Sequence, residues 1–231
     1  MPEIIGLIGA MDEEIRLLLE GMEDRETVVK AGINYYTGTL FGKSVVLCKC
    51  GVGKVNAAVT TQILLDTFGA SQVLFTGVAG AVHPELNIGD IVISSSCMQH
   101  DMDVTALGYP RGIIPYQEVS SFCANPALVL LAEQACVELK QKYLIGKVLS
   151  GDQFIANADV VAELKEQLDG ACAEMEGAAV AQVCYMYDTP FVVIRSMSDK
   201  ADGSAHVNFR EFTVEASERS HAILEYMLKA L

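Results

Sequence analysis

The chain has 231 residues, of which 51% are hydrophobic and 20% are charged, and its formal net charge is −14 at pH 7. This apolar content is enough for a sizeable core, and no repeat, linker or low-complexity segment divides the chain, so we predict one domain over residues 1–231. The acidic balance argues against nucleic acid as a partner, because DNA and RNA present phosphate charges of the same sign.

The first residues carry acids and no basic segment, which argues against a secretory signal. No apolar run reaches the length of a membrane span, so no membrane partner is expected. The seven cysteines are scattered, and no CxxC pair occurs among them. We therefore expect reduced cysteines and a cytoplasmic location.

Strands and helices alternate in the first half of the chain. Apolar runs and turn residues predict strands over residues 3–9, 35–40, 44–50, 72–76 and 90–94, and apolar spacing predicts helices over 12–20 and 54–68. The 72–76 strand is expected to stop at the Gly77–Gly80 turn. Residues 100–117 contain repeated Gly and Pro and are predicted to form a long loop of functional importance.

The second half continues the alternation. Helices are predicted over residues 126–140, 159–168 and 177–187, strands over 146–150, 171–174 and 190–196, and an amphipathic helix at the end of the chain. The pattern is typical of the α/β class. We expect a single-domain three-layer α/β/α architecture, in which helices flank a central mixed, largely parallel twisted sheet.

Several familiar motifs are incomplete. The run Gly51-Val52-Gly53-Lys54 lacks the third glycine of a dinucleotide fingerprint and the Ser or Thr of a P-loop. The chain contains no HExxH and no paired-cysteine spacing, and His100-Asp101-Met102-Asp103 is better explained as a hydrogen-bonded loop than as a metal cluster. We therefore expect no metal and no cofactor.

Three carboxylates follow predicted strands, where ligands bind in α/β folds. Glu14 comes just after the first strand, Glu176 after the 171–174 strand, and Asp199 after the 190–196 strand. Each alone could be a helix cap or a turn residue. Together they indicate acid–base chemistry at one site.

Eight motifs carry a resemblance that runs from Ile4 to the final helix. They are GAMDEE (9–14), CGVGKVNAA (50–58), TGVAGA (76–81), GDIV (89–92), HDMDVTALGY (100–109), SGDQFI (150–155), EMEGAA (174–179) and RSMSD (195–199). In this order and spacing, the chain resembles the bacterial 5′-methylthioadenosine/S-adenosylhomocysteine nucleosidases of the nucleoside phosphorylase superfamily. The resemblance implies hydrolysis of the N-glycosidic bond, with release of adenine and a thioribose product.

The resemblance also implies roles for individual residues. Asp199 would protonate purine N7 with help from Ser198, Glu14 would activate the attacking water, and Glu176 would accept the ribose hydroxyls. The substrate-binding residues implied are Ala10, Met11, Val52, Ala79, Gly80, Phe154, Ile155, Met175, Glu176, Ser198 and Phe209. Phe154 would stack on the base and Met175 would pack on the sugar. In a homodimer, Leu107, Tyr109 and Pro115 would reach the neighbouring pocket.

The sequence departs from the family at Cys50, Val78 and Leu107, which leaves the preferred 5′ substituent open. Three other functions also stay open. A phosphorylase on the same fold would need an anion site, for which Arg195 and Lys54 are the cationic candidates. A futalosine-type hydrolase and a nucleoside-binding module without catalysis are the other two.

Overall fold

The computed structural model describes residues 3–200 and 205–231, with only the backbone described for residues 205–211. The strands are β1 (Ile5–Gly9), β2 (Glu23–Lys30), β3 (Ile33–Leu40), β4 (Lys43–Lys49), β5 (Gln72–Ala81), β6 (Ile91–Gln99), β7 (Ser121–Cys123), β8 (Tyr143–Ser150), β9 (Gly170–Glu174) and β10 (Phe191–Asp199). The helices are α1 (Asp12–Gly21), α2 (Lys54–Asp66), α3 (Pro126–Glu138), α4 (Ala158–Leu168), α5 (Gly177–Met186) and α6 (Ala205–Ala230).

One mixed sheet contains all of these strands. Strand β5 lies between parallel neighbours β1 and β10, and the pairs β1–β4, β6–β8 and β8–β9 are also parallel. Antiparallel pairing is more extensive than we expected, and it joins β2–β3, β3–β4, β6–β7, β6–β10 and β5–β9. Because β9 returns to the end of β5, the strands β5, β10, β6, β8 and β9 close into a ring.

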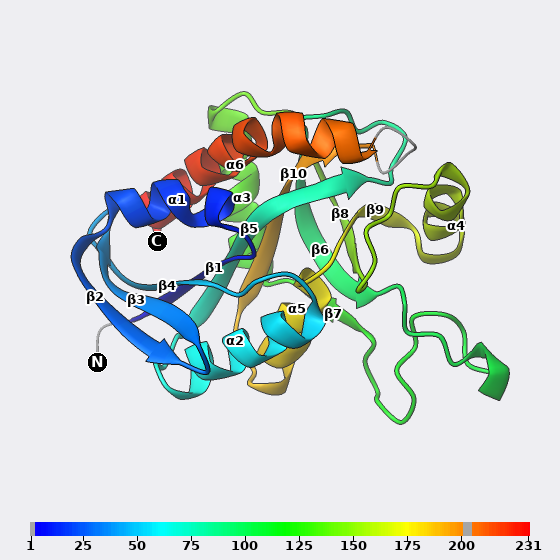
Figure 1. The fold of residues 1–231 in the computed structure, drawn as a ribbon, viewed down its shortest axis with the longest axis horizontal. Helices are drawn as coiled ribbons and strands as arrows, with labels where there is room; N and C mark the ends of the chain where they lie inside the picture. The colour runs from blue at the N-terminus through cyan, green and yellow to red at the C-terminus, as the bar shows by residue number, and fades with distance from the viewer. Residues whose placement is uncertain (1–2, 201–204) are drawn as a thin grey trace.

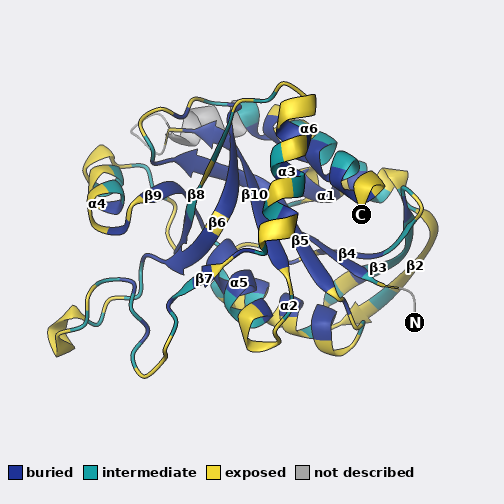
Figure 2. Ribbon diagram, turned by 180° about the vertical axis from the view of Figure 1, so that it is seen from behind, coloured by how far each residue is buried: buried dark blue, intermediate teal, exposed yellow. Residues whose placement is uncertain are grey.

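Helices cover both faces of this sheet (Figure 1). Helices α1, α3 and α6 pack on one side, and α2 and α5 pack together on the other. Figure 2 shows the middle strands β5, β6 and β10 buried, with exposed residues on the outer helix faces and the β2–β3 hairpin. The predicted α/β architecture, with a mixed sheet between helices, is confirmed. None of the described helices has the length and apolar character needed to cross a membrane.

The largest error of the sequence prediction concerns β5. This strand does not stop at Thr76 but continues through the Gly77–Gly80 segment to Ala81, and all of it is buried. A glycine is needed at position 77 because other groups approach the strand closely there. A Cβ on Gly77 would lie 2.6 Å from Glu14 Oε1 and 2.8 Å from an Arg195 guanidinium nitrogen. Gly77 therefore leaves space for these two side chains, and it does not end the strand.

Two strands were not predicted, and several others besides β5 were predicted too short; β10, for example, runs to Asp199 instead of ending at Ser196. Strand β2 is polar and almost wholly exposed at the edge of the sheet, so its sequence lacks an apolar alternation. Strand β7 has only three residues. Strand β6 runs to Gln99 instead of ending at Ser94. The predicted loop over residues 100–117 is confirmed, apart from one 3-10 turn at Thr105–Leu107.

Candidate active site

A cavity of about 270 Å³ lies where residues from the ends of β1, β5, β9 and β10 meet. The turn before α2 and the loop after β8 complete its wall. Its volume is close to the lower end of the range for small-molecule sites, which begins at about 300 Å³. The lining consists of Ala10, Met11, Glu14, Val52, Val78, Ala79, Gly80, Gln153, Phe154, Ile155, Ala173, Glu174, Met175, Glu176, Ser198 and Asp199.

Glu14 is held in the first turn of α1 by backbone donors. Its Oε2 accepts hydrogen bonds from the N–H groups of Ala10 (2.6 Å) and Met11 (3.0 Å), and its Oε1 accepts one from Val78 N–H (3.0 Å). The bond from Met11 caps the helix, so this carboxylate has a structural role as well. Burial raises the pKa of Glu14 above its ordinary value, although Arg195 and the three N–H donors act against the shift. Such a carboxylate can serve as a base near neutral pH.

Glu176 is the N-cap residue of α5, and its side chain points toward the turn before α2. Its Oε1 accepts a hydrogen bond of 2.9 Å from Gly53 N–H. Gly53 has a φ of 99°, which a residue with a side chain rarely adopts. Burial, and then the nearby Glu174 carboxylate, raise the pKa of Glu176 to about 8. The side chain is therefore able to exchange a proton in the physiological range.

Asp199 is the last residue of β10 and is only 2% exposed. The pairing of β10 with β5 shifts its register between Met197 and Asp199, which places Asp199 opposite Gly80. The hydroxyl of Ser198 donates a hydrogen bond of 2.9 Å to Asp199 Oδ2. A carboxyl group held in this way, at the end of a buried strand, is positioned for proton transfer to a ligand in the cavity.

The buried ion pair between Arg195 and Glu174, whose carboxyl group lines the cavity, was not predicted from the sequence. Arg195 is 1% exposed, and its guanidinium donates to Glu174 Oε2 from Nη2 at 2.6 Å and from Nε at 3.2 Å. Glu174 also accepts hydrogen bonds from the hydroxyl of Ser150 and from Gly177 N–H. Burial disfavours the charge of Arg195, yet Glu174, Glu14 and Glu176 together raise its pKa. Arg195, at the end of the otherwise apolar run 191–195, was the signal for this pair, because a buried cation requires a counter-ion.

The apolar part of the cavity comes mainly from the loop after β8 and from β5. Phe154 and Ile155 stand on that loop, and half of Phe154 remains exposed. Ala79 and Gly80 contribute from the end of β5, and Met175 contributes from the residue after β9. An apolar cleft with a few converging carboxyl groups suits a flat heterocycle attached to a polar sugar.

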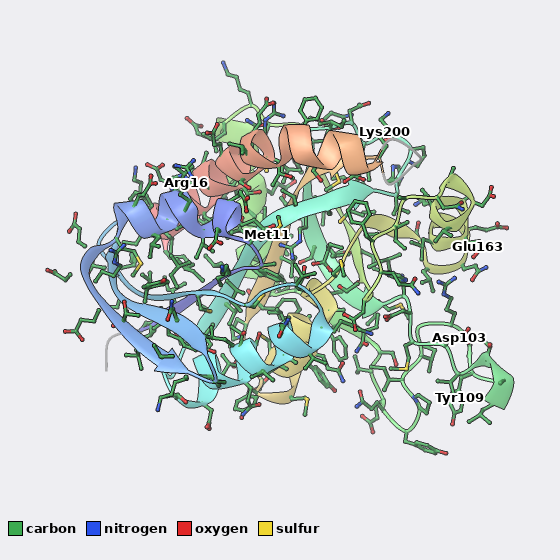
Figure 3. The ribbon with its side chains drawn as sticks, viewed as in Figure 1. Met11, Arg16, Asp103, Tyr109, Glu163 and Lys200 are labelled. Carbon is green, nitrogen blue, oxygen red and sulfur yellow. The ribbon has the colours of Figure 1, made fainter. Side chains whose placement is uncertain are left out.

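Some predicted site residues lie elsewhere. Leu107, Tyr109 and Pro115 do not line this cavity but belong to the loop of residues 100–117, which projects from the body of the molecule. Figure 3 labels Tyr109 and Asp103 on that loop, far from Met11 at the start of α1. Leu107 is 72% exposed. The side chain of Phe209 lies outside the described residues.

Lys54, a cationic candidate for an anion site, already binds side chains of the protein itself. Its ammonium group contacts Asp101 Oδ1 at 2.6 Å and Gln99 Oε1 at 2.9 Å. Across the part of the chain that the structure describes, no three or more His, Cys, Asp or Glu side chains form a group that could hold a metal ion. All seven cysteines are unpaired.

Comparisons with known proteins agree with this arrangement. The family model described as "Phosphorylase superfamily" matches residues 4–229. A 5′-methylthioadenosine/S-adenosylhomocysteine nucleosidase from Pseudoalteromonas translucida is 42% identical over 229 residues, which is 98% of this chain and 97% of that protein.

Solved structures give the same result. The nucleosidase of the same name from Neisseria meningitidis, in complex with methylthio-immucillin-A, matches with a TM-score of 0.95 and 38% identity over 99% of this chain and 100% of that chain. A futalosine hydrolase mutant from Helicobacter pylori also reaches a TM-score of 0.95, with 33% identity over 99% of this chain and 100% of that chain.

The fold, the cavity between strand ends and the family match define a member of the phosphorylase superfamily. Within it, the chain belongs to the family of the 5′-methylthioadenosine/S-adenosylhomocysteine nucleosidases. It is therefore an enzyme of the N-glycosyl hydrolase class, as the sequence predicted.

Proposed function

We propose that residues 1–231 form a single domain that hydrolyses the N-glycosidic bond of 5′-methylthioadenosine and S-adenosylhomocysteine. 5′-Deoxyadenosine is a third candidate substrate. The observation that carries this proposal is the convergence of three buried carboxyl groups, from Glu14, Glu176 and Asp199, on one mostly apolar cavity. The names of the related proteins support the choice of nucleosides.

Glu14 is proposed as the base that activates water. The water's oxygen forms a bond to C1′ of the ribose while its proton passes to the carboxylate. The raised pKa of Glu14, which burial causes, makes it a stronger base than an exposed glutamate. The positive charge that develops on the sugar is stabilised by nearby carboxylates in a site with little water.

Asp199 is proposed as the acid. The bond between C1′ and N9 breaks, and the electron pair passes to the purine while Asp199 donates its proton to N7, so that neutral adenine leaves. The Ser198 hydroxyl, 2.9 Å from Asp199 Oδ2, supports this role because it fixes the orientation of the carboxyl group.

The remaining lining residues are proposed to bind the substrate. Glu176 accepts the ribose hydroxyls and Met175 packs on the sugar. Phe154 stacks on the base, while Ile155 offers backbone hydrogen bonds to it. The walls are completed by Ala10, Met11, Val52, Ala79 and Gly80.

Phosphorolysis is disfavoured because the two candidate cations already form ion pairs within the protein. Arg195 is bound to Glu174 and Lys54 is bound to Asp101, so neither is available as a separate phosphate ligand. A phosphate ion would also face the Glu14 carboxylate. Release of adenine from 5′-methylthioadenosine in phosphate-free buffer, at a rate that added phosphate does not increase, is the expected result. Release that requires phosphate would overturn the proposal.

Two variants test the assigned roles. We expect Glu14→Gln and Asp199→Asn each to lower kcat by roughly 100-fold or more. Glu13→Gln is the matched control, because this neighbouring acid on α1 is exposed and does not line the cavity. EDTA should leave the rate unchanged. A Glu14→Gln enzyme that retained its full rate would refute the base assignment.

The futalosine hydrolase and the binding module remain as outcomes of the same assay. The structural similarity to a futalosine hydrolase makes futalosine a necessary second substrate in the panel. Turnover of futalosine without turnover of 5′-methylthioadenosine would favour that function. Tight binding of both nucleosides without release of a base would identify a binding module.

We propose a homodimer in which Leu107, Tyr109 and Pro115 contribute to the neighbouring pocket. The exposure of Leu107, together with the distance of this loop from its own cavity, supports the proposal. Sedimentation should give a dimer, and Leu107→Ser should raise KM more than the equivalent change at exposed Leu130 on α3. A fully active monomer would contradict this. A cytoplasmic location stays a prediction.

A further inference from the structure

Three charged residues beside the cavity form a closed ring of hydrogen bonds that the proposed chemistry does not use. Lys54 N–H donates to Asp152 Oδ1 at 2.8 Å, and the Lys54 ammonium donates to Asp101 Oδ1 at 2.6 Å. Asp152 N–H then donates to Asp101 Oδ2 at 2.9 Å. The three residues come from the start of α2, the loop after β6 and the loop after β8, so the ring ties together three distant parts of the chain.

The ring is partly shielded from water. The side chains of Lys54 and Asp101 are only 18% and 17% exposed. Burial works against the charge of Asp101, but hydrogen bonds from Lys54 and from Asp152 N–H hold its pKa below the ordinary value. Lys54 also donates to Gln99 Oε1, and Gln99 in turn donates to Gln182 of α5 at 2.7 Å. A charge pair in such a network contributes more than an exposed pair does.

The ring is connected to two parts of the cavity wall, one at Glu176 and the other at Phe154. The adjacent N–H groups of Gly53 and Lys54 donate to different partners, the first to Glu176 Oε1 and the second to Asp152 Oδ1. Phe154 follows Asp152 by two residues on the loop after β8, and its side chain is half exposed. Residues 152–154 are exposed, so the position of this part of the loop depends on hydrogen bonds more than on burial of its own side chains.

We propose that the ring of Lys54, Asp101 and Asp152 is a positioning device, which holds residues 151–155 and thereby Phe154 in place to bind the purine base. This inference rests on the proposed function of Phe154 as the base-stacking residue. All three ring members are positioning residues, since none of them lines the cavity. Loosening the ring should weaken the affinity for the purine. The proposed general acid Asp199 and general base Glu14 should stay in place.

The central variant is Lys54→Met, which removes the ammonium group and keeps the backbone N–H. We expect the Kd for adenine, measured by calorimetry, to rise about tenfold, with a similar rise in KM and a change of less than about threefold in kcat. Lys229→Met is the matched control, because Lys229 forms an ion pair with Glu225 on the surface of α6. Asp152→Asn retains an oxygen acceptor for Lys54 N–H and should preserve affinity better than Asp152→Ala.

A double-mutant cycle separates positioning from general structural support. If the ring acts through Phe154, Lys54→Met should have little effect on adenine binding in a Phe154→Ala background. An equally large effect in both backgrounds would overturn the inference, as would an unchanged Kd in Lys54→Met alone.

Hydrogen exchange of residues 151–155 tests the same inference without any ligand. We expect faster exchange in Lys54→Met than in the wild type or in Lys229→Met. Unchanged exchange would overturn the positioning role. If the exchange is faster but the wild-type protein neither binds adenine nor releases it, the proposed function fails while the ring's control of the loop stands.

Discussion

Glu176→Gln should change how the stability of this protein depends on pH. Glu176 is 6% exposed, and burial together with Glu174 raises its pKa from 4.5 to about 8. Between these two values the folded state binds a proton that the unfolded state has lost. The free energy of unfolding therefore falls as pH rises from about 4.5 to 8, and the stabilising contribution is fully present only below the lower value. Glutamine cannot ionise, so the variant lacks this part of the slope.

The magnitude follows from the size of the shift. Each pH unit in this interval changes the stability by up to 1.36 kcal/mol, so the full interval gives an upper limit of about 5 kcal/mol. Reorganisation of the surrounding groups reduces this value. We therefore expect the contribution of Glu176 to the free energy of unfolding to differ by about 2 kcal/mol or more between pH 4.5 and pH 8. The variant should gain stability relative to the wild type as pH rises, and the gain should level off above pH 8.

Urea unfolding at fixed protein concentration, at pH values from 4.5 to 9, measures this difference. A fixed concentration is needed because the proposed dimer would add a stabilisation that depends on concentration. Glu166→Gln on α4 is the control, since Glu166 is exposed and stands away from the cavity. Parallel stability curves for wild type and Glu176→Gln would refute the reasoning, because they would mean that Glu176 ionises alike in the folded and the unfolded chain.

Three further substitutions test the packing around the carboxyl groups. Gly77→Ala places a Cβ 2.6 Å from Glu14 Oε1, so it should destabilise the fold by roughly 1–3 kcal/mol in urea unfolding and lower kcat as well. Ser198→Ala removes the hydrogen bond to Asp199, and steady-state assays should show kcat reduced by roughly 10- to 100-fold with little change in KM. Val78→Ser should leave kcat/KM within about twofold, because Val78 contacts Glu14 through its backbone N–H; a tenfold change would mean that the side chain contributes.

The sequence predicted the elements that have a regular apolar pattern. Helices such as α1 and α4 have one apolar face, and strands such as β1 are short buried runs, so local periodicity was enough to locate them. Strand β2 could not be found in this way, because it is almost wholly exposed and its two valines are adjacent instead of alternating with polar residues. The length of β5 could not be predicted either, because the sequence does not show that Gly77, a residue type that often interrupts a strand, makes room here for the side chains of Glu14 and Arg195.

The candidate site was predictable where the relevant residues follow strands. Glu14, Glu176 and Asp199 were singled out for their positions, and the structure brings them to one cavity. The pairing of Arg195 with Glu174 could not be derived, because it depends on which strand ends become neighbours when β9 returns to β5. Hydrogen bonds from Gly53 and Val78 were hidden for a second reason, since backbone donors carry no sequence signal.

The charges around the cavity favour water over phosphate as the nucleophile. The described lining residues include four carboxyl groups and no lysine or arginine, and Arg195 behind them is bound to Glu174. Among the described lining residues, a phosphate ion would lose its hydration without gaining a free cationic partner, which is costly in a buried site. The sugar, in contrast, becomes positive only as its bond to the base breaks, and it then meets carboxylates that are already fixed in place. In the proposed mechanism, the carboxyl groups that disfavour phosphate would therefore also stabilise the transition state, so the choice of water would need no separate structural element.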